Sequence, residues 1–155
     1  MANGSAAIRP GTEDPAVSVR FAVKLDSMEL GEFNSCEGLG CEVVIEQREE
    51  GGNNGFVWQL PTRIKYPNIK LSRPLTKKTE TVAKWFAQAV QGSGARTAEG
   101  TKTGEIRALT GDGDVVAIWE LLDVVPVRWT GPSLNLESPK VATETIEIAH
   151  HGFKA

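Results

Sequence analysis

The sequence predicts a mainly β fold, a β-sandwich or barrel with one packed α-helix. Many short segments alternate apolar and polar residues, which is the period of a half-buried strand. Clusters of turn residues separate these segments, and only residues 77–91 show helical periodicity. No linker interrupts the chain after residue 15. We therefore expect one domain over 16–155, preceded by a flexible arm over 1–15 that is rich in Gly, Pro and polar residues.

The first expected strand covers residues 17–25. Its apolar residues alternate with polar ones and share one face: Val17, Val19, Phe21, Val23 and Leu25. Residues 26–32 are expected to form a turn that leads into a short strand at Phe33.

Residues 36–49 alternate apolar and polar side chains again. Together with the return strand that follows, residues 41–60 are typical of a long β-hairpin. The outgoing strand places Cys41, Val43, Ile45 and Gln47 on one face, and Glu42, Val44, Glu46 and Arg48 on the other. The tip, residues 51–55, reads Gly-Gly-Asn-Asn-Gly, which favours a flexible loop. Pro61 follows the return strand, and a proline within a strand indicates an edge, a bend or a bulge.

After a further extended stretch over 63–71, the period becomes helical. Thr76 is a suitable N-cap for a helix over 77–91, whose apolar face is Val82, Trp85, Phe86 and Ala89. The remaining segments are β: strands over 103–110 and 115–122 around a Gly-Asp-Gly-Asp turn, an extended stretch over 123–130 and a last strand over 141–150. In the last strand Ala142, Ile146 and Ile148 share one face, and Thr143, Thr145 and Glu147 share the opposite, polar face.

Composition narrows the class of protein. The 155 residues carry a formal net charge of −3, with 40% hydrophobic and 24% charged residues, as in ordinary soluble domains. No basic run or face indicates nucleic-acid binding. No apolar segment approaches the ~20 residues of a membrane helix, and we expect no signal peptide. Cys36 and Cys41 are too few for a disulfide framework, so they predict reduced thiols and a cytoplasmic compartment.

The sequence contains no arrangement that predicts catalysis, a cofactor or a metal. A phosphate loop and a dinucleotide fingerprint are both absent. His150 and His151 are neighbours on a strand and should point to opposite faces, which disfavours a metal site. The carboxylates Glu46, Glu49 and Glu50 are interpreted as the solvated end of a hairpin. Trp58 leaves open a stacking platform for a sugar.

One ordered set of residues is distinctive. It consists of Phe33, Gly38-Leu39, the run Glu46-Gln-Arg-Glu-Glu-Gly-Gly-Asn-Asn54, Leu60-Pro61, Lys65-Tyr-Pro-Asn-Ile-Lys-Leu71, a helix with Trp85-Phe86, Pro126-Val-Arg-Trp-Thr-Gly-Pro132, and Thr145-Ile-Glu-Ile-Ala-His-His-Gly-Phe153. Over about residues 17–153 the set resembles the tail tube protein family of contractile phages, especially the inner tube proteins of phage-tail-like extracellular contractile injection systems.

The resemblance implies a structural subunit that forms hexameric rings, which stack into a tube driven out by sheath contraction. Two hairpins from each subunit would join edge to edge in a continuous β-barrel around the lumen. The implied partners are further copies of the chain, a sheath protein, the baseplate hub or tube initiator, a tape measure protein and cargo in the lumen. Assembly would take place in the cytoplasm, and the phage-tail-like particle would be released from the cell.

Alternation within the long hairpin then assigns candidate site residues. Glu42, Glu46 and Arg48 would face the lumen, while Val43 and Ile45 would face the subunit's own core. The tip loop would reach an adjacent ring or subunit, and it consists of Gly51, Gly52, Asn53, Asn54 and Gly55.

Three alternatives stay open. Pro61-Thr62 and Ser72-Arg73-Pro74 depart from the runs often found in the family, so a tube initiator ring on the baseplate hub stays open as an alternative to the main tube subunit. A secreted hexameric ring of the type VI class would share the fold. A carbohydrate-binding β-sandwich with Trp58 as its platform belongs to a different class.

Overall fold

The computed structural model describes residues 19–26, 28–52, 55–91, 102–132, 137 and 142–154. The expected arm over 1–15 and the tip residues Asn53 and Asn54 lie outside this part. The elements in chain order are β1 (Arg20–Leu25), β2 (Met28–Phe33), β3 (Ser35–Glu37), β4 (Glu42–Arg48), β5 (Trp58–Lys65), β6 (Ile69–Pro74), α1 (Thr79–Gln91), β7 (Lys102–Leu109), β8 (Val115–Thr130) and β9 (Thr143–Ala149). The predicted mainly β fold with one helix is confirmed for the described residues.

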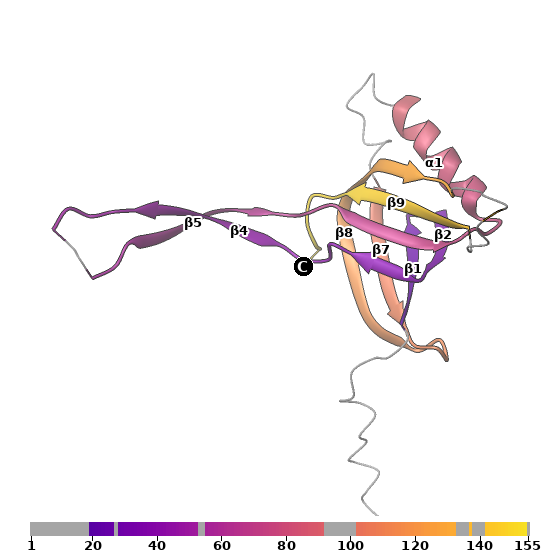
Figure 1. Ribbon diagram of the computed structural model, residues 1–155, viewed down its shortest axis with the longest axis horizontal. Coiled ribbons are helices and arrows are strands. Elements are labelled where there is room, and N and C mark those ends of the chain that lie inside the picture. The colour runs from indigo at the N-terminus through magenta and orange to yellow at the C-terminus, as the bar shows by residue number, and fades with distance from the viewer. Residues whose placement is uncertain are drawn as a thin grey trace, which may run out of the picture.

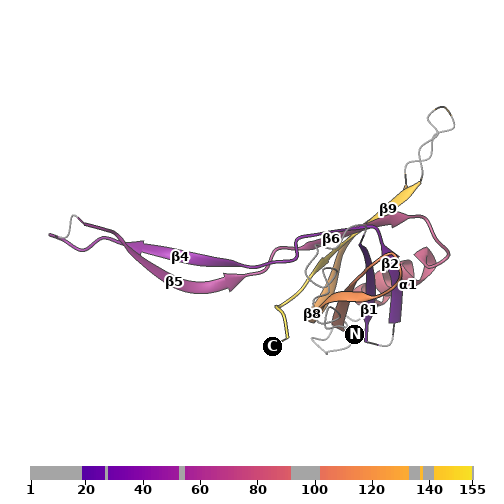
Figure 2. The ribbon, with the colours of Figure 1, turned by 90° about the horizontal axis from the view of Figure 1, so that it is seen from below.

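Seven strands form one antiparallel sheet in the order β2-β1-β7-β8-β9-β6-β3, and β4 and β5 form a separate two-stranded ribbon. The large sheet curls so that its two halves face each other in a sandwich-like body, from which the ribbon projects (Figures 1 and 2). The sheet is open rather than a closed barrel. Of the two predicted forms, the sandwich is therefore the one observed.

The bend of the sheet lies in β8, a single 16-residue strand where the sequence predicted two segments. Its first half pairs with β7 and its second half with β9. Gly104 pairs with Leu121 and Lys102 with Val124, so β8 carries one extra residue there. Asp123 has φ 50°, a value favoured at bulges and turns. This bulge lets one strand belong to both halves of the sandwich.

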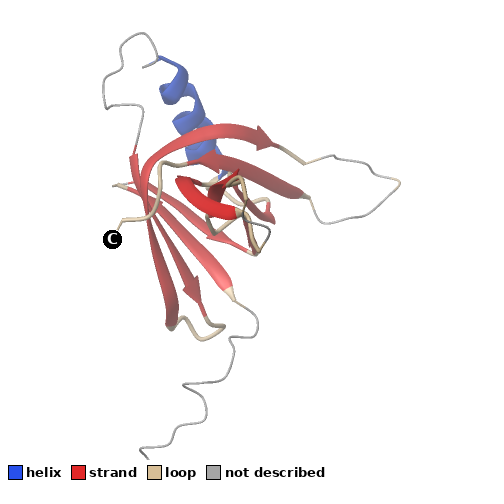
Figure 3. Cartoon of the chain, turned by 90° about the vertical axis from the view of Figure 1, so that its left-hand side faces the viewer, coloured by secondary structure: helices blue, strands red, loops and turns tan. Residues whose placement is uncertain are grey.

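The core lies between the halves of the sheet and is closed by α1 (Figure 3). Val23 and Leu25 of β1 and Ile146 and Ile148 of β9 are buried, as their alternation predicted. On α1, Val82 and Trp85 are buried and Phe86 packs against the core, which confirms the predicted helix face. The amide of Lys78 donates to Thr76 Oγ1 at 3.2 Å, so Thr76 caps the start of this helix as expected.

Two predicted boundaries around β2 and β3 were wrong. Residues 26–32 were expected to be a turn, but β2 already begins at Met28 and pairs with β1 through Leu25. The segment 36–49 was expected to be continuous, but it splits into β3 and β4 at Gly38. Gly38 has φ +94°, and a Cβ there would lie 2.2 Å from the Asn68 carbonyl oxygen. The close crossing of two backbones, which alternation does not report, therefore ends β3.

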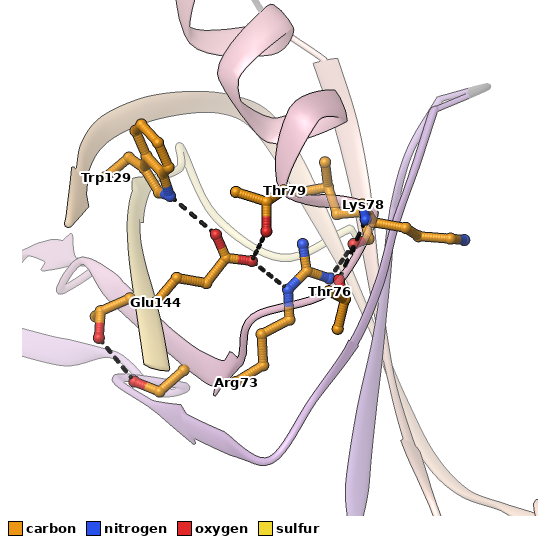
Figure 4. Close-up of polar contacts among 9 residues, drawn as sticks. Arg73, Thr76, Lys78, Thr79, Trp129 and Glu144 are labelled. Carbon is orange, nitrogen blue, oxygen red and sulfur yellow. Dashed lines mark hydrogen bonds and ion pairs between the residues drawn. The ribbon is translucent and has the colours of Figure 1, made fainter. Parts of the chain in front are cut away.

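A buried ion pair fastens the elements around the start of α1 (Figure 4). Arg73 Nε on β6 lies 2.6 Å from Glu144 Oε1 on β9, and both side chains are almost fully buried. Glu144 also accepts hydrogen bonds from Thr79 Oγ1 on α1 and from Trp129 Nε1 on β8. The Arg73 guanidinium donates to the Leu30 carbonyl on β2. Five elements therefore meet at one pair of charges.

We expect Glu144→Gln to destabilise the fold by about 3 kcal/mol, because it leaves the Arg73 charge buried without its counter-charge. Urea denaturation of dilute protein measures this change. The matched control is Glu80→Gln, which removes an exposed pair with Lys84 and should cost at most about 0.5 kcal/mol. Equal urea midpoints for Glu144→Gln and the unmodified protein would contradict this reading of the network.

Candidate assembly surface

The β4–β5 ribbon extends away from the body (Figures 1 and 2). Its pairing runs from Glu42 opposite Lys65 at the root to Arg48 opposite Trp58 near the tip. Within the described residues, neither strand pairs with any strand of the large sheet. Seven residues of β4 at about 3.3 Å each give a paired length of about 23 Å. Both outer edges of the ribbon consequently offer unpaired backbone groups over that length.

The expected disturbance at Pro61 is a β-bulge. Val44 pairs with Arg63 and Ile45 with Pro61, which leaves Thr62 as the extra residue on β5. Thr62 Oγ1 donates a hydrogen bond of 2.8 Å to the Val44 carbonyl, so the bulge is pinned by a side chain. Pro61 therefore lies inside the return strand, which continues to Lys65 rather than ending near residue 60.

The two faces of the ribbon differ in chemistry. One face is mostly apolar and carries Val43, Ile45 and Ile64, which are 45%, 45% and 53% exposed. The opposite face is mixed. It carries Glu42, Val44, Glu46 and Arg48 on β4 and, directly opposite or beside them on β5, Lys65, Arg63, Leu60 and Trp58. The expectation that Val43 and Ile45 face the subunit's own core was wrong, because the ribbon leaves the body and carries both residues with it. Apolar side chains so exposed mark a surface that a partner covers.

Aromatic and acidic side chains gather near the tip. Trp58 is 44% exposed, donates from Nε1 to Glu50 Oε2 at 3.2 Å and packs edge-on against Phe56, with ring centroids 5.1 Å apart. Gly51, Gly52 and Gly55 of the predicted loop are exposed beside them. The sequence identified the acidic and glycine residues here but did not identify Phe56 as their neighbour.

The root of the ribbon is held by the C-terminal segment of the chain. Tyr66, directly after β5, packs against the rings of His150 and Phe153 at centroid distances of 5.4 and 5.8 Å. A Cβ on Gly152 would lie 3.1 Å from the Tyr66 ring, so glycine permits this contact. Leu122 of β8 exchanges two backbone hydrogen bonds of 2.8 Å with this segment. The direction of the ribbon thus depends on residues that follow the last strand.

The two histidines face opposite ways, as predicted. His150 is buried, and this burial, followed by the nearby charge of His151, lowers the pKa of His150, against a raising contribution from the Gly152 backbone. His151 is exposed and lies 3.1 Å from Asp123. Burial, with a smaller effect of Glu37, raises the pKa of Cys36 to about 11, whereas Cys41 is exposed.

Neither a metal-binding nor a membrane-spanning feature is present in the described part of the chain. No group of three or more His, Cys, Asp or Glu side chains there is arranged to hold a metal. The described helix is too short and too polar to cross a bilayer.

Comparison with known proteins gives a family and several related folds. The family described as T4-like virus tail tube protein gp19 matches residues 17–154. A chain from the sheath–tube complex of an extracellular contractile injection system, PVC, in its extended state shares 20% identity with a TM-score of 0.74, over 99% of this chain and 97% of that one. A chain from the anti-feeding prophage baseplate shares 21% identity with a TM-score of 0.70, over 92% of this chain and 95% of that one. Hcp1 from Salmonella typhimurium shares 12% identity with a TM-score of 0.53, over 86% of this chain and 83% of that one. No curated protein sequence matches the chain.

From the burial of His150 we expect the free energy of unfolding to fall in acid. Since the pKa of His150 is lowered in the folded state, the unfolded chain takes up this proton first as the pH falls below about 6.5. Urea denaturation at pH 7.5 and 5.5 should show a lower free energy of unfolding at pH 5.5, and His150→Phe should reduce the difference. His151→Gln, on the exposed side, is the control: it removes only the smaller charge effect on His150, leaves the burial in place and should keep most of the difference. An unchanged difference in His150→Phe would refute the assignment.

Proposed function

We propose a function from one premise: the chain belongs to the T4-like virus tail tube protein family, whose model matches nearly all of it. This membership confirms the resemblance seen in the sequence. The chain is a structural subunit of the inner tube of a contractile injection system or phage tail, and it acts by stacking into a conduit rather than by catalysis. The tail tube domain spans residues 16–155.

The observation that carries this proposal is the projecting β4–β5 ribbon. A two-stranded ribbon on its own is at best marginally stable in water. This ribbon also exposes an apolar face and two unpaired edges. Neighbouring copies would cover the face and continue the strands, so that a hazard for a monomer becomes the means of assembly. We infer hexameric rings in which ribbons from all six subunits contribute to one barrel around the lumen.

The charged side chains on the face of the ribbon opposite Val43 and Ile45 support the assignment of the lumen. Glu42, Glu46 and Arg48 share that face with Arg63 and Lys65, and charged side chains suit a water-filled channel. Trp58 lies on the same face at its outer end, next to the tip. Val43 and Ile45 then pack against a neighbouring subunit instead of their own core. The loop of Gly51, Gly52, Asn53, Asn54 and Gly55 reaches an adjacent ring or subunit.

The remaining partners follow from the same function. A sheath protein surrounds the tube, the baseplate hub or initiator begins it, and a tape measure protein and cargo occupy the lumen. Subunits are made in the cytoplasm and leave the cell as part of the particle. Support comes from the solved relative described as a sheath–tube complex of an extracellular contractile injection system.

The second candidate is the tube initiator, favoured by the similar fold of a chain from the anti-feeding prophage baseplate. The two candidates differ in self-association. A main tube subunit polymerises into long tubes, whereas an initiator forms single rings. Electron microscopy of the purified protein separates them. Persistent monomers that bind a sugar through Trp58 would favour the carbohydrate-binding alternative instead.

We expect Val43→Glu with Ile45→Glu to abolish rings and tubes, because two carboxylates cannot be buried unpaired in an apolar interface. Negative-stain electron microscopy and sedimentation measure assembly, and circular dichroism checks that the monomer remains folded. Glu42→Lys with Glu46→Lys, two substitutions on the opposite face, is the matched control and should still assemble. Loss of assembly in this control would refute the lumen assignment, and normal tubes in Val43→Glu/Ile45→Glu would refute the interface.

A further inference from the structure

We propose that a groove at the end of the body opposite the ribbon receives the ribbon tip of a second copy of this chain. The groove lies between β2 and the β6–α1 connection. In this groove, Lys77 and Lys78 of one copy pair with the carboxylates of Glu49 and Glu50 of the other. Trp58 of the entering tip packs on Leu75, the exposed apolar residue beside the groove. The inference rests on the proposed tube function and identifies the receiving surface.

The groove has a volume of about 520 Å³ and is lined by Gly31, Glu32, Asn34, Pro74, Lys77 and Lys78, with Arg73 in its wall. Gly31 lets the Arg73 guanidinium approach the backbone of β2, since a Cβ there would lie 2.8 Å from Arg73 Nη1. Arg73 is in turn held by the buried pair with Glu144. This part of the wall is therefore in place before any partner arrives, which lowers the entropy cost of docking.

The charge available in the groove is positive. Glu32 is already paired with Arg20 at 2.7 Å. Lys78 lies 3.8 Å from Glu29 in an exposed pair, and Lys77 is exposed with no ion-pair partner among the described residues. Leu75, next to the groove, is 41% exposed and supplies apolar surface. The site thus combines exposed ammonium groups with an apolar contact.

The ribbon tip has the complementary chemistry. Arg48 lies 3.7 Å from Glu46, so that pair is internally balanced. Glu49 and Glu50 then leave an excess of two negative charges at the end of the ribbon. Glu50 accepts from Trp58, which places a carboxylate beside an exposed indole. Tryptophan is among the residues most enriched in binding hot spots, so Trp58 is suited to anchor the contact.

Position favours a second copy as the occupant. In Figure 1 the ribbon tip and the connection from β6 to α1 lie at opposite ends of the molecule, so one chain cannot bring them together. A contact between opposite ends of identical chains is heterologous, and repeated contacts of this kind generate rings or helical filaments. Another exposed basic pair of the body, Lys70 and Arg128, shares its hollow with the Glu147 carboxylate and is a poorer acceptor for an acidic tip.

Reciprocal charge reversal tests the pairing. Lys77→Glu with Lys78→Glu, and separately Glu49→Lys with Glu50→Lys, should each abolish tubes by placing like charges in contact. All four substitutions in one chain should restore tubes, because the charges are exchanged rather than lost. Normal tubes in either double variant, or none in the fourfold variant, would overturn the inference.

A second measurement uses the unmodified protein and needs no variant. A carbodiimide joins only carboxylates and amines that are already in contact. Tubes mixed from nitrogen-14 and nitrogen-15 subunits should yield mixed-isotope cross-links between Glu49 or Glu50 and Lys77 or Lys78 by mass spectrometry. Lys84, on the outer side of α1 and paired with Glu80, is the internal control and should give no link to the tip.

The outcomes keep the two proposals apart. Tubes that lack the links between tip and groove would refute this docking site and leave the tube function standing. A purified chain that forms neither rings nor tubes would refute the tube function itself. Links between tip and groove in assembled tubes, together with rescue by charge exchange, support both.

Discussion

The buried pair of Arg73 and Glu144 is the interaction on which the body depends. It joins β6 to β9, and through Thr79 and Trp129 it also fixes the start of α1 and the second half of β8. Burying two charges is costly unless they are paired and hydrogen-bonded. Glu144 accepts from Arg73, Thr79 and Trp129, whereas Arg73 Nη2 is buried without a hydrogen-bond partner in the described part of the chain. The pair therefore disfavours arrangements that separate these elements, and the same contacts hold Arg73 in the wall of the adjacent groove.

The ribbon contrasts with the body, because it exposes apolar side chains where the body buries charged ones. Its paired backbone is complete internally, but its apolar face is open to solvent and its edges lack neighbours in the described chain. The body buries charge at its centre, whereas the ribbon exposes Val43, Ile45 and Ile64 at the periphery. Under the proposed function, a neighbouring subunit covers this apolar face. The C-terminal segment that holds Tyr66 gives the ribbon a defined direction, which a repeating assembly requires.

Local patterns predicted what depends on local periodicity. The alternation in β1 and β9 identified Val23, Leu25, Ile146 and Ile148 as core residues, because one face of each strand is buried. The same alternation failed for the ribbon: it separated Val43 and Ile45 from Glu42 and Glu46 correctly, but it contains no information on what each face meets. It also overlooked Glu144, which lies on the buried face of β9, since its partners come from elements distant in sequence.

Residue patterns along the chain were enough to predict the class of fold, the helix, the long hairpin and, through an ordered set of weak motifs, the family. These follow from period, turn chemistry and residue order, which are properties of neighbouring residues. Three features became visible only in the folded chain: the hairpin leaves the body, β8 serves both halves of the sheet, and Arg73 meets Glu144 beneath an open groove. Those features depend on contacts between segments tens of residues apart, and no local pattern encodes such contacts.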